Sequence, residues 1–174
     1  LPVLAAGTGS VVLDGGPPLR SRPFDDQMAA LSELGAQLES LQQPGRLPIR
    51  VTGRRLSGGR VAVAASVSSQ FTSGLLLAGP VFDGELVVEL LGDIVSRPYL
   101  DLTLNVMVAF GATVERLDDR TFCVAPTGYT AADVAIEPDA SAASYFLAAA
   151  AITGGWVRVE GLDRSSPQGD IEFA

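Results

Sequence analysis

Histidine is absent from this 174-residue chain, and Cys123 is its only cysteine. No internal disulfide can therefore form. Without histidine, serine–histidine and cysteine–histidine nucleophiles and histidine-based metal sites are excluded. Cys123 lies between Phe122 and Val124 in an alternating, strand-like run, where we expect a buried structural thiol.

Basic residues are also scarce, since 12 Lys and Arg stand against 20 Asp and Glu and give a net charge of −8. An acidic chain of this kind is not expected to bind nucleic acid. It can still bind a small anion where backbone amides and a few arginines converge.

Long apolar runs are missing as well. The longest, residues 146–152, is rich in alanine and too short to span a bilayer. No basic segment precedes an apolar run and a cleavage site, so we expect a cytoplasmic protein without a membrane partner. The chain begins at Leu1 and stops soon after Gln168-Gly169-Asp170-Ile171, and we expect both ends to be cut from a longer protein.

The sequence that is present repeats with a period of about 75 residues. Arg22-Pro23-Phe24 recurs as Arg97-Pro98-Tyr99, and Gln70-Phe71 recurs as Tyr145-Phe146, both at an offset of 75 residues. Leu34-Gly35-Ala36 recurs as Phe110-Gly111-Ala112 at an offset of 76. Chance recurrence of common strings is the alternative, but three anchors at nearly one offset favour tandem βαβαββ units.

Hydrophobic periodicity predicts the elements of these units. Apolar residues at intervals of three and four predict a helix that continues from Phe24 through Leu38 and Leu41. Helices are also predicted at residues 68–77, 98–110 and 141–152. The second of these has Leu100, Leu104, Met107 and Val108 on its apolar side. Strands are predicted at residues 11–13, 48–51, 61–65, 86–90, 122–125, 134–136 and 156–159. Helices that are apolar on most sides must be covered, so we expect helices in the middle and sheets outside.

The most distinctive polar segment is Ser66-Val67-Ser68-Ser69-Gln70-Phe71, directly before a predicted buried helix. The first turn of a helix has unpaired backbone N–H groups beside the positive end of the dipole. Two hydroxyls and an amide donor at that place would suit a phosphate. Ordinary capping by one serine is the simpler interpretation.

A similar segment, Ser96-Arg97-Pro98-Tyr99, begins the next helix of the second unit. Ser96 can cap the helix, and Tyr99 can present its ring and hydroxyl to a polar ligand. Arg20 and Arg22 precede the first long helix, where a guanidinium can pair with a carboxylate or phosphate. Surface solvation is the simpler interpretation for both, and we prefer it for Arg20.

Two acidic residues stand near polar segments but lack an evident catalytic partner. Asp139 lies just before the helix at residue 141, and Asp170 lies near the end of the chain. Either can cap a helix or lie on the surface. Glycine-rich phosphate loops of the Walker or dinucleotide-binding type are absent.

Together these strings resemble the 5-enolpyruvylshikimate-3-phosphate synthase family over nearly the whole chain. They follow its order and spacing: Arg22-Pro23, Val67-Ser68-Ser69-Gln70-Phe71, Val95-Ser96-Arg97-Pro98-Tyr99, Asp139-Ala140-Ser141-Ala142-Ala143-Ser144-Tyr145-Phe146-Leu147 and Gln168-Gly169-Asp170-Ile171. Each string alone is a weak match, whereas five in order are specific.

The resemblance implies an α/β fold of tandem βαβαββ units that form an inside-out α/β barrel, with buried helices and outer sheets. It also implies transfer of the enolpyruvyl group of phosphoenolpyruvate to the 5-hydroxyl of shikimate 3-phosphate, with release of phosphate. Such an enzyme needs no metal or organic cofactor, and its partners are the two small-molecule substrates.

Carried over by position, the resemblance makes Ser68, Ser69 and Ser96 ligands of shikimate 3-phosphate. It implies that Gln70 touches both substrates and that Tyr99 lies against the shikimate ring. Arg22 would hold phosphoenolpyruvate.

The departures from the family are equally specific. An initial Lys-Ser…Arg segment, an Asn-Ala-Gly-Thr stretch followed by Arg, the later catalytic Asp and Glu, and cations of the opposite half are all absent. The chain therefore contains no catalytic residue and is expected to be inactive alone.

The family's pattern divides the chain into residues 1–138, an incomplete half that binds shikimate 3-phosphate, and residues 139–174, the crossover and the start of the opposite half. The apolar helix after Ser141 would then lack its usual neighbours. It must fold back, swap or dimerise to stay covered.

Two other hypotheses remain at this point. One is the related transferase that acts on UDP-N-acetylglucosamine, which has a reactive cysteine in a loop, unlike Cys123. The other is a non-catalytic structural or interaction module on the same scaffold.

Overall fold

A computed structural model describes residues 1–65, 69–94 and 97–173 of the chain. The helices are α1 (Pro2–Ala6), α2 (Pro17–Arg20), α3 (Asp25–Glu33), α4 (Ser69–Ala78), α5 (Arg97–Ala109) and α6 (Ala140–Thr153), with short 3₁₀ turns η1 (Gly79–Val81) and η2 (Gly169–Phe173). The strands are β1 (Gly9–Leu13), β2 (Gln37–Ser40), β3 (Ile49–Gly53), β4 (Gly59–Ala64), β5 (Leu86–Leu91), β6 (Val114–Arg116) and β7 (Thr121–Val124).

The predicted repeat is confirmed by the topology of the two sheets. Strands β4 and β5 are parallel, and antiparallel pairing continues the second sheet in the order β4-β5-β7-β6. The first sheet has the order β1-β3-β2 with the same antiparallel pairings as β5-β7-β6. Residues 59–124 therefore form one complete βαβαββ unit, and β1, α3, β2 and β3 repeat its later part.

Alternation of apolar residues fixes which face of each strand is buried. In β4, Val61 and Val63 are buried while their neighbours Arg60 and Ala62 are exposed. A one-residue slip would expose the whole apolar set, so the burial pattern specifies the register.

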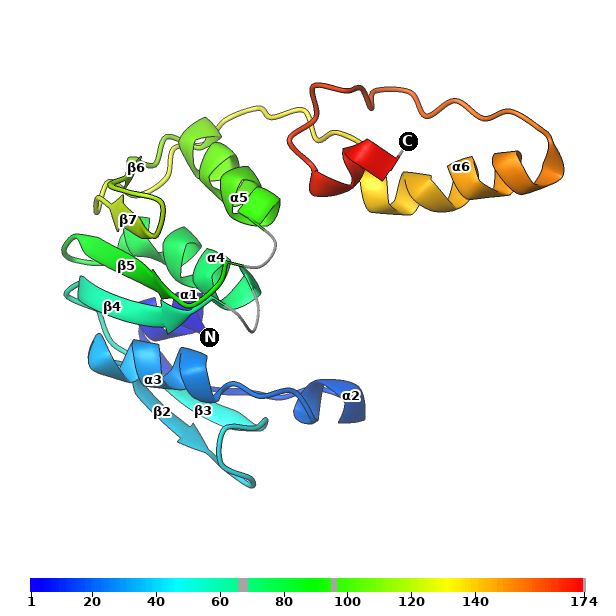
Figure 1. Cartoon of the computed structure of the whole chain (residues 1–174). Helices are drawn as coiled ribbons and strands as arrows, with labels where there is room; N and C mark the ends of the chain where they lie inside the picture. The colour runs from blue at the N-terminus through cyan, green and yellow to red at the C-terminus, as the bar shows by residue number, and fades with distance from the viewer. Residues whose placement is uncertain (66–68, 95–96, 174) are drawn as a thin grey trace.

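Helices α1, α3 and α4 pack between the two sheets in one hydrophobic core. Helix α3 contacts β2 of its own sheet and β4 of the other, and α1 contacts both β3 and α4 (Figure 1). Leu31, Ile49 and Leu75 are fully buried in the same core cluster, together with Leu86 of the second sheet. The prediction of inner helices and outer sheets is therefore confirmed for residues 1–124.

The first long helix is shorter than predicted. It ends at Glu33, because Gly35 has a φ of 93° that continues no right-handed helix. Leu38 lies in β2 and pairs with Val51 of β3, and Leu41 directly follows β2. The sequence prediction extended a helical period into a strand because a half-buried leucine matches both patterns over so short a run.

Three further predictions from periodicity are wrong. Val108 is 58% exposed on α5, although Leu100 and Met107, which were predicted on the same apolar side, are buried. Residues 134–136 and 156–159 form no strands, and Ile136 and Trp156 are 85% and 87% exposed. A segment with a strand pattern forms a strand only beside another strand that pairs with its backbone, and these two segments have no such neighbour in the described part of the chain.

Helix α6 forms as predicted but is not covered. Asp139 caps it by accepting a hydrogen bond from the Ala142 amide at 3.1 Å, and Gly154 ends it in the left-handed conformation. Figure 1 shows α6 projecting away from the two sheets, with the returning segment of residues 154–173 running alongside it. Tyr145, Phe146 and Ile152 are consequently 78%, 63% and 85% exposed.

Gln168 fastens the returning segment to the start of α6. Its side-chain carbonyl accepts a hydrogen bond from the Ala140 amide at 2.7 Å, and its side-chain amide donates to the Pro138 carbonyl at 2.8 Å. Asp170 accepts a hydrogen bond from the Ser141 hydroxyl. Within the described residues, no helix is sufficiently long and apolar to cross a bilayer.

Thr72 is an anomaly in the core, because its hydroxyl has no hydrogen-bond partner among the described residues although the side chain is only 1% exposed. A buried polar group without a partner costs free energy. We expect Thr72→Val, which keeps the shape and removes the hydroxyl, to raise the free energy of unfolding by about 1 kcal/mol. Urea unfolding measures this change.

Thr121→Val is the matched control for this prediction. Thr121 is equally buried in a strand, but its hydroxyl bonds to the Asp118 carboxylate. Removing that hydroxyl should lower stability, so a loss of stability in both variants would contradict the interpretation of Thr72.

Candidate functional site

The parallel pairing of β4 and β5 brings the starts of two helices to one end of the second sheet. Helix α4 follows β4 and helix α5 follows β5, so both helices run back along the sheet in the same direction. The two helices also pack directly on each other. Their first turns, which contain predicted ligands of the shikimate ester, therefore lie at the same end of the molecule.

Three of the predicted site residues are described in these two helix starts. Ser69 is the first residue of α4 and is half-buried, and Gln70 follows it with an exposed side chain. Tyr99 lies in the first turn of α5 and is 48% exposed. Ser68 and Ser96 lie outside the described residues. None of the three described residues is turned into the hydrophobic interior.

Arg22 lies between α2 and α3 with an exposed side chain that makes no ion pair or hydrogen bond within the described residues. Arg20 behaves differently, because its Nε donates to Asp14 Oδ1 at 2.8 Å. Hydrogen bonding from Arg20 lowers the pKa of Asp14 below its ordinary value. Arg20 thus lies on the surface, as preferred from the sequence, and it is paired there with Asp14. Arg22 is available to an anion.

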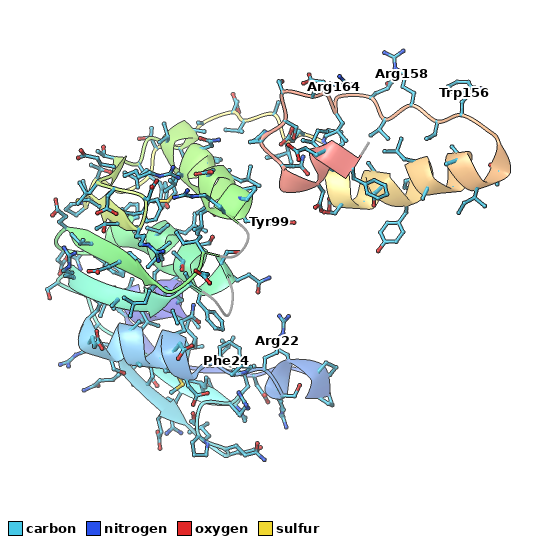
Figure 2. The ribbon with its side chains drawn as sticks, in the orientation of Figure 1. Arg22, Phe24, Tyr99, Trp156, Arg158 and Arg164 are labelled. Atoms are coloured by element: carbon cyan, nitrogen blue, oxygen red, sulfur yellow. The ribbon has the colours of Figure 1, made fainter. Side chains whose placement is uncertain are left out.

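Phe24 connects the Arg22 segment to the start of α4. Its ring centroid lies 6.4 Å from that of Phe71, which follows Ser69-Gln70. The Phe24 amide donates to the Gly45 carbonyl at 2.9 Å, so the loop between β2 and β3 also holds this segment. Figure 2 shows Arg22 and Tyr99 on the same side of the molecule, each projecting away from the ribbon.

Arg97, the counterpart of Arg22 in the repeat, is already engaged. Its guanidinium donates to the Asp119 carbonyl at 2.7 Å and to the Asp119 carboxylate at 3.2 Å. Asp119 belongs to the turn between β6 and β7, and Arg120 of the same turn donates to the Gly92 carbonyl. Equivalent positions in the two units therefore differ: Arg97 holds a hairpin, whereas Arg22 has no partner among the described residues.

The other acidic candidates have structural roles. Asp139 caps α6, and Asp170 accepts the Ser141 hydroxyl, as described above. Within the described ranges, no three acidic or cysteine side chains lie close enough together to hold a metal ion.

Two surface hollows of about 210 Å³ each lie away from the helix starts. One lies between α6 and the returning segment and is lined by Leu147, Val159, Leu162, Asp163, Arg164 and Ile171. The other lies on the outer face of the first sheet and is lined by Gln37, Leu38, Glu39, Arg50 and Thr52. Neither contains a predicted site residue.

Comparisons with known proteins decide the family. The model of the EPSP synthase family (3-phosphoshikimate 1-carboxyvinyltransferase) matches residues 1–174. The chain belongs to the EPSP synthase family. It is 45% identical over 174 residues to the 3-phosphoshikimate 1-carboxyvinyltransferase of Vibrio atlanticus, a match that covers 98% of this chain and 41% of that protein. It is 47% identical over 173 residues to the same enzyme of Erwinia tasmaniensis, covering 98% of this chain and 40% of that protein.

Solved structures agree with the fold. EPSP synthase from Acinetobacter baumannii superposes with a TM-score of 0.70 and 26% identity, covering 86% of this chain and 32% of that one. The enolpyruvyl transferase NikO from Streptomyces tendae superposes with a TM-score of 0.63, at 18% identity and with coverage of 85% and 34%. This EPSP synthase family chain spans about two fifths of the length of the curated relatives named above. Because those relatives have enzyme names, they give no support to a non-catalytic module.

Sequence reasoning missed the residues that hold the EPSP synthase segments together. Phe24 was assigned only to the apolar face of a helix, and the hydroxyls of Ser73 and Thr103, which link α4 to α5, were not considered. A signal was available, because Ser73 follows Ser69 by four residues and Thr103 follows Tyr99 by four. Side chains at that spacing lie on the same face of a helix.

Cys123 lies in β7 as predicted, but it is half-buried rather than buried. Burial raises the pKa of its thiol to about 11, with further contributions from a hydrogen bond to Glu85 and from the charges of Glu85 and Glu115. The thiol is therefore protonated at neutral pH and a poor nucleophile.

We expect iodoacetamide to label Cys123 of the folded chain at pH 8 about 100-fold more slowly than the urea-unfolded chain, because a pKa of about 11 instead of 9.0 reduces the thiolate by that factor. Mass spectrometry of quenched time points measures both rates. Because the folded pKa is the higher one, stability should also fall as the pH rises from about 9 toward 11. Equal labelling rates would contradict the pKa assignment.

Proposed function

We propose that this chain is the part of an EPSP synthase that binds shikimate 3-phosphate. The parent enzyme would transfer the enolpyruvyl group of phosphoenolpyruvate to the 5-hydroxyl of shikimate 3-phosphate and release phosphate. The observation that supports this most strongly is the common end of α4 and α5, because two polar helix starts of a family member face the same solvent region.

We assign the ligand contacts to the residues expected from the sequence: Arg22, Ser68, Ser69, Gln70, Ser96 and Tyr99. A helix start offers backbone N–H groups and a positive dipole end to a phosphate, and a serine hydroxyl adds a further donor. Tyr99 has half its surface free to lie against a polar ring. Arg22 is unpaired within the described residues and would pair with the phosphoenolpyruvate anion.

The chemistry would depend on orientation and on charge stabilisation supplied by other parts of the parent enzyme. This chain would contribute binding but no general acid or base, and neither metal nor organic cofactor is required by the proposed reaction. It would therefore be inactive alone. Because both substrates are phosphorylated anions that cross bilayers poorly, we propose a cytoplasmic location and no membrane or nucleic-acid partner.

We also propose that the chain divides at residue 138. Residues 1–138 would form the half that binds shikimate 3-phosphate, and residues 139–174 would begin the opposite half. The way α6 projects from the two sheets supports this division (Figure 1).

We expect the 174-residue chain to bind shikimate 3-phosphate with a dissociation constant of about 1 mM or lower, measured by isothermal titration calorimetry. Ser69→Ala should weaken binding about 10-fold or more, because a hydrogen bond to a charged phosphate is lost. Ser32→Ala, on the exposed face of α3, is the matched control and should bind as the unmodified chain does. No heat at millimolar ligand would overturn the assignment.

We further propose that the chain self-associates through α6 in a second copy. Tyr145, Phe146 and Ile152 are more than half exposed, and Trp156 lies beyond the same helix with 87% of its surface exposed. Exposed apolar patches of this kind are typical of interaction surfaces.

We expect sedimentation velocity at about 100 µM to show a dimer or larger species for the unmodified chain. Phe146→Glu should shift the population to monomer, because it buries a charge in the proposed contact. Leu117→Glu changes an exposed leucine on the turn after β6 and should leave the distribution as it was. A monomeric unmodified chain would contradict self-association.

A further inference from the structure

Two hydroxyls connect α4 and α5 just inside the proposed site. Ser73 Oγ lies 2.8 Å from Thr103 Oγ1, and Thr103 Oγ1 donates to the Tyr99 carbonyl at 2.7 Å. A hydroxyl has only one proton to donate. Because Thr103 donates its proton to the Tyr99 carbonyl, Ser73 must donate to Thr103. The direction of the hydrogen bonds, from Ser73 to Thr103 and from Thr103 to the Tyr99 carbonyl, is therefore fixed.

This hydroxyl chain lies one helical turn inside the first turns of both helices. Ser73 follows Ser69 by four residues on α4, and Thr103 follows Tyr99 by four residues on α5. Since residues four apart share a helix face, Ser69 and Tyr99 are on the faces that meet at Ser73 and Thr103. Because the two helices run in the same direction, Ser69 and Tyr99 lie at the same end of the α4–α5 contact, which we call the seam.

The apolar contacts around this seam do not determine its register. Leu75 and Leu76 of α4 and Leu100 and Met107 of α5 are buried, but hydrophobic burial is non-directional. Hydrogen bonds require defined distances and angles, so they can stop one helix from sliding along the other. The pair Ser73–Thr103 is a side-chain hydrogen bond that joins α4 to α5.

We propose that Ser73 and Thr103 are positioning residues. They would fix the position of Ser69 relative to Tyr99 along the axes of the two packed helices α4 and α5. The proposal rests on the proposed function, because it concerns two residues assigned to the shikimate 3-phosphate site. In this proposal neither Ser73 nor Thr103 touches the ligand. Their hydrogen bond holds the two helices that carry Ser69 and Tyr99.

A hydrogen bond from threonine to the backbone of its own helix does not by itself explain this arrangement. Threonine hydroxyls inside helices commonly donate to the carbonyl four residues earlier. Thr153 of α6 makes this bond to the Ala149 carbonyl at 2.9 Å and has no bond to another helix among the described residues. Thr153 is therefore a matched control with the same local bond but without the link.

The experiment measures the affinity of the 174-residue chain for shikimate 3-phosphate by calorimetry at a temperature where all variants are folded. Ser73→Ala and Thr103→Val should each weaken binding about 5- to 10-fold. Thr103→Ser retains the hydroxyl and should bind within about 2-fold of the unmodified chain, as should Thr153→Val. The double variant Ser73→Ala/Thr103→Val should bind no more weakly than the single variant with the lower affinity, because both changes break the same hydrogen bond. Equal affinity in all variants would overturn the proposal.

A ligand-free measurement separates this proposal from the proposed function. Amide NMR signals report the helix opposite each substitution: Thr103→Val should shift Ser69 on α4, and Ser73→Ala should shift Tyr99 on α5. Thr103→Ser and Thr153→Val should shift neither. If the unmodified chain binds no ligand, the proposed function fails, yet the cross-helix signals still decide the positioning. Unchanged Ser69 and Tyr99 signals would overturn the positioning whatever the calorimetry gives.

Discussion

The parallel pairing of β4 with β5 is the constraint on which the candidate site depends. It forces α4 and α5 to begin at the same end of the sheet, 28 residues apart along the chain. Backbone hydrogen bonds in the sheet set this geometry before any ligand is present. The Phe24–Phe71 contact then attaches a third segment, which includes Arg22, to the same helix start. Three polar segments that are distant in sequence are thereby brought to the same end of the molecule.

Burial explains why the same type of sequence has two different fates in this chain. Helix α4 packs against α1, α5 and the second sheet, so Leu75 and Leu76 are fully buried. Helix α6 is also strongly apolar and occupies the equivalent place in the repeat, but its main contact among the described elements is with η2 of the returning segment. Phe71 is therefore half-buried against Phe24, whereas its counterpart Phe146 is 63% exposed. The difference lies in the neighbours and not in the helix.

Charge is distributed so that an acidic chain can still present an available cation. Most arginines are paired with carboxylates, including Arg20 with Asp14, Arg60 with Glu89 and Arg97 with Asp119. Such exposed pairs contribute little stability. Arg22 makes no such pair among the described residues, and this distinguishes it from its counterpart Arg97 in the second unit.

The repeat, the order of most elements and the family were determined by the sequence alone, because apolar periodicity and short motifs are local properties of the chain. The sequence left open whether Asp139 caps α6 or lies on the surface. The pairing of Leu38 in β2, the loss of strands at residues 134–136 and 156–159, and the exposure of α6 were decided only by tertiary structure. Each depends on whether a partner strand or a covering helix is present. The same holds for the Ser73–Thr103 link, since no local pattern reveals which hydroxyl on a neighbouring helix will meet it.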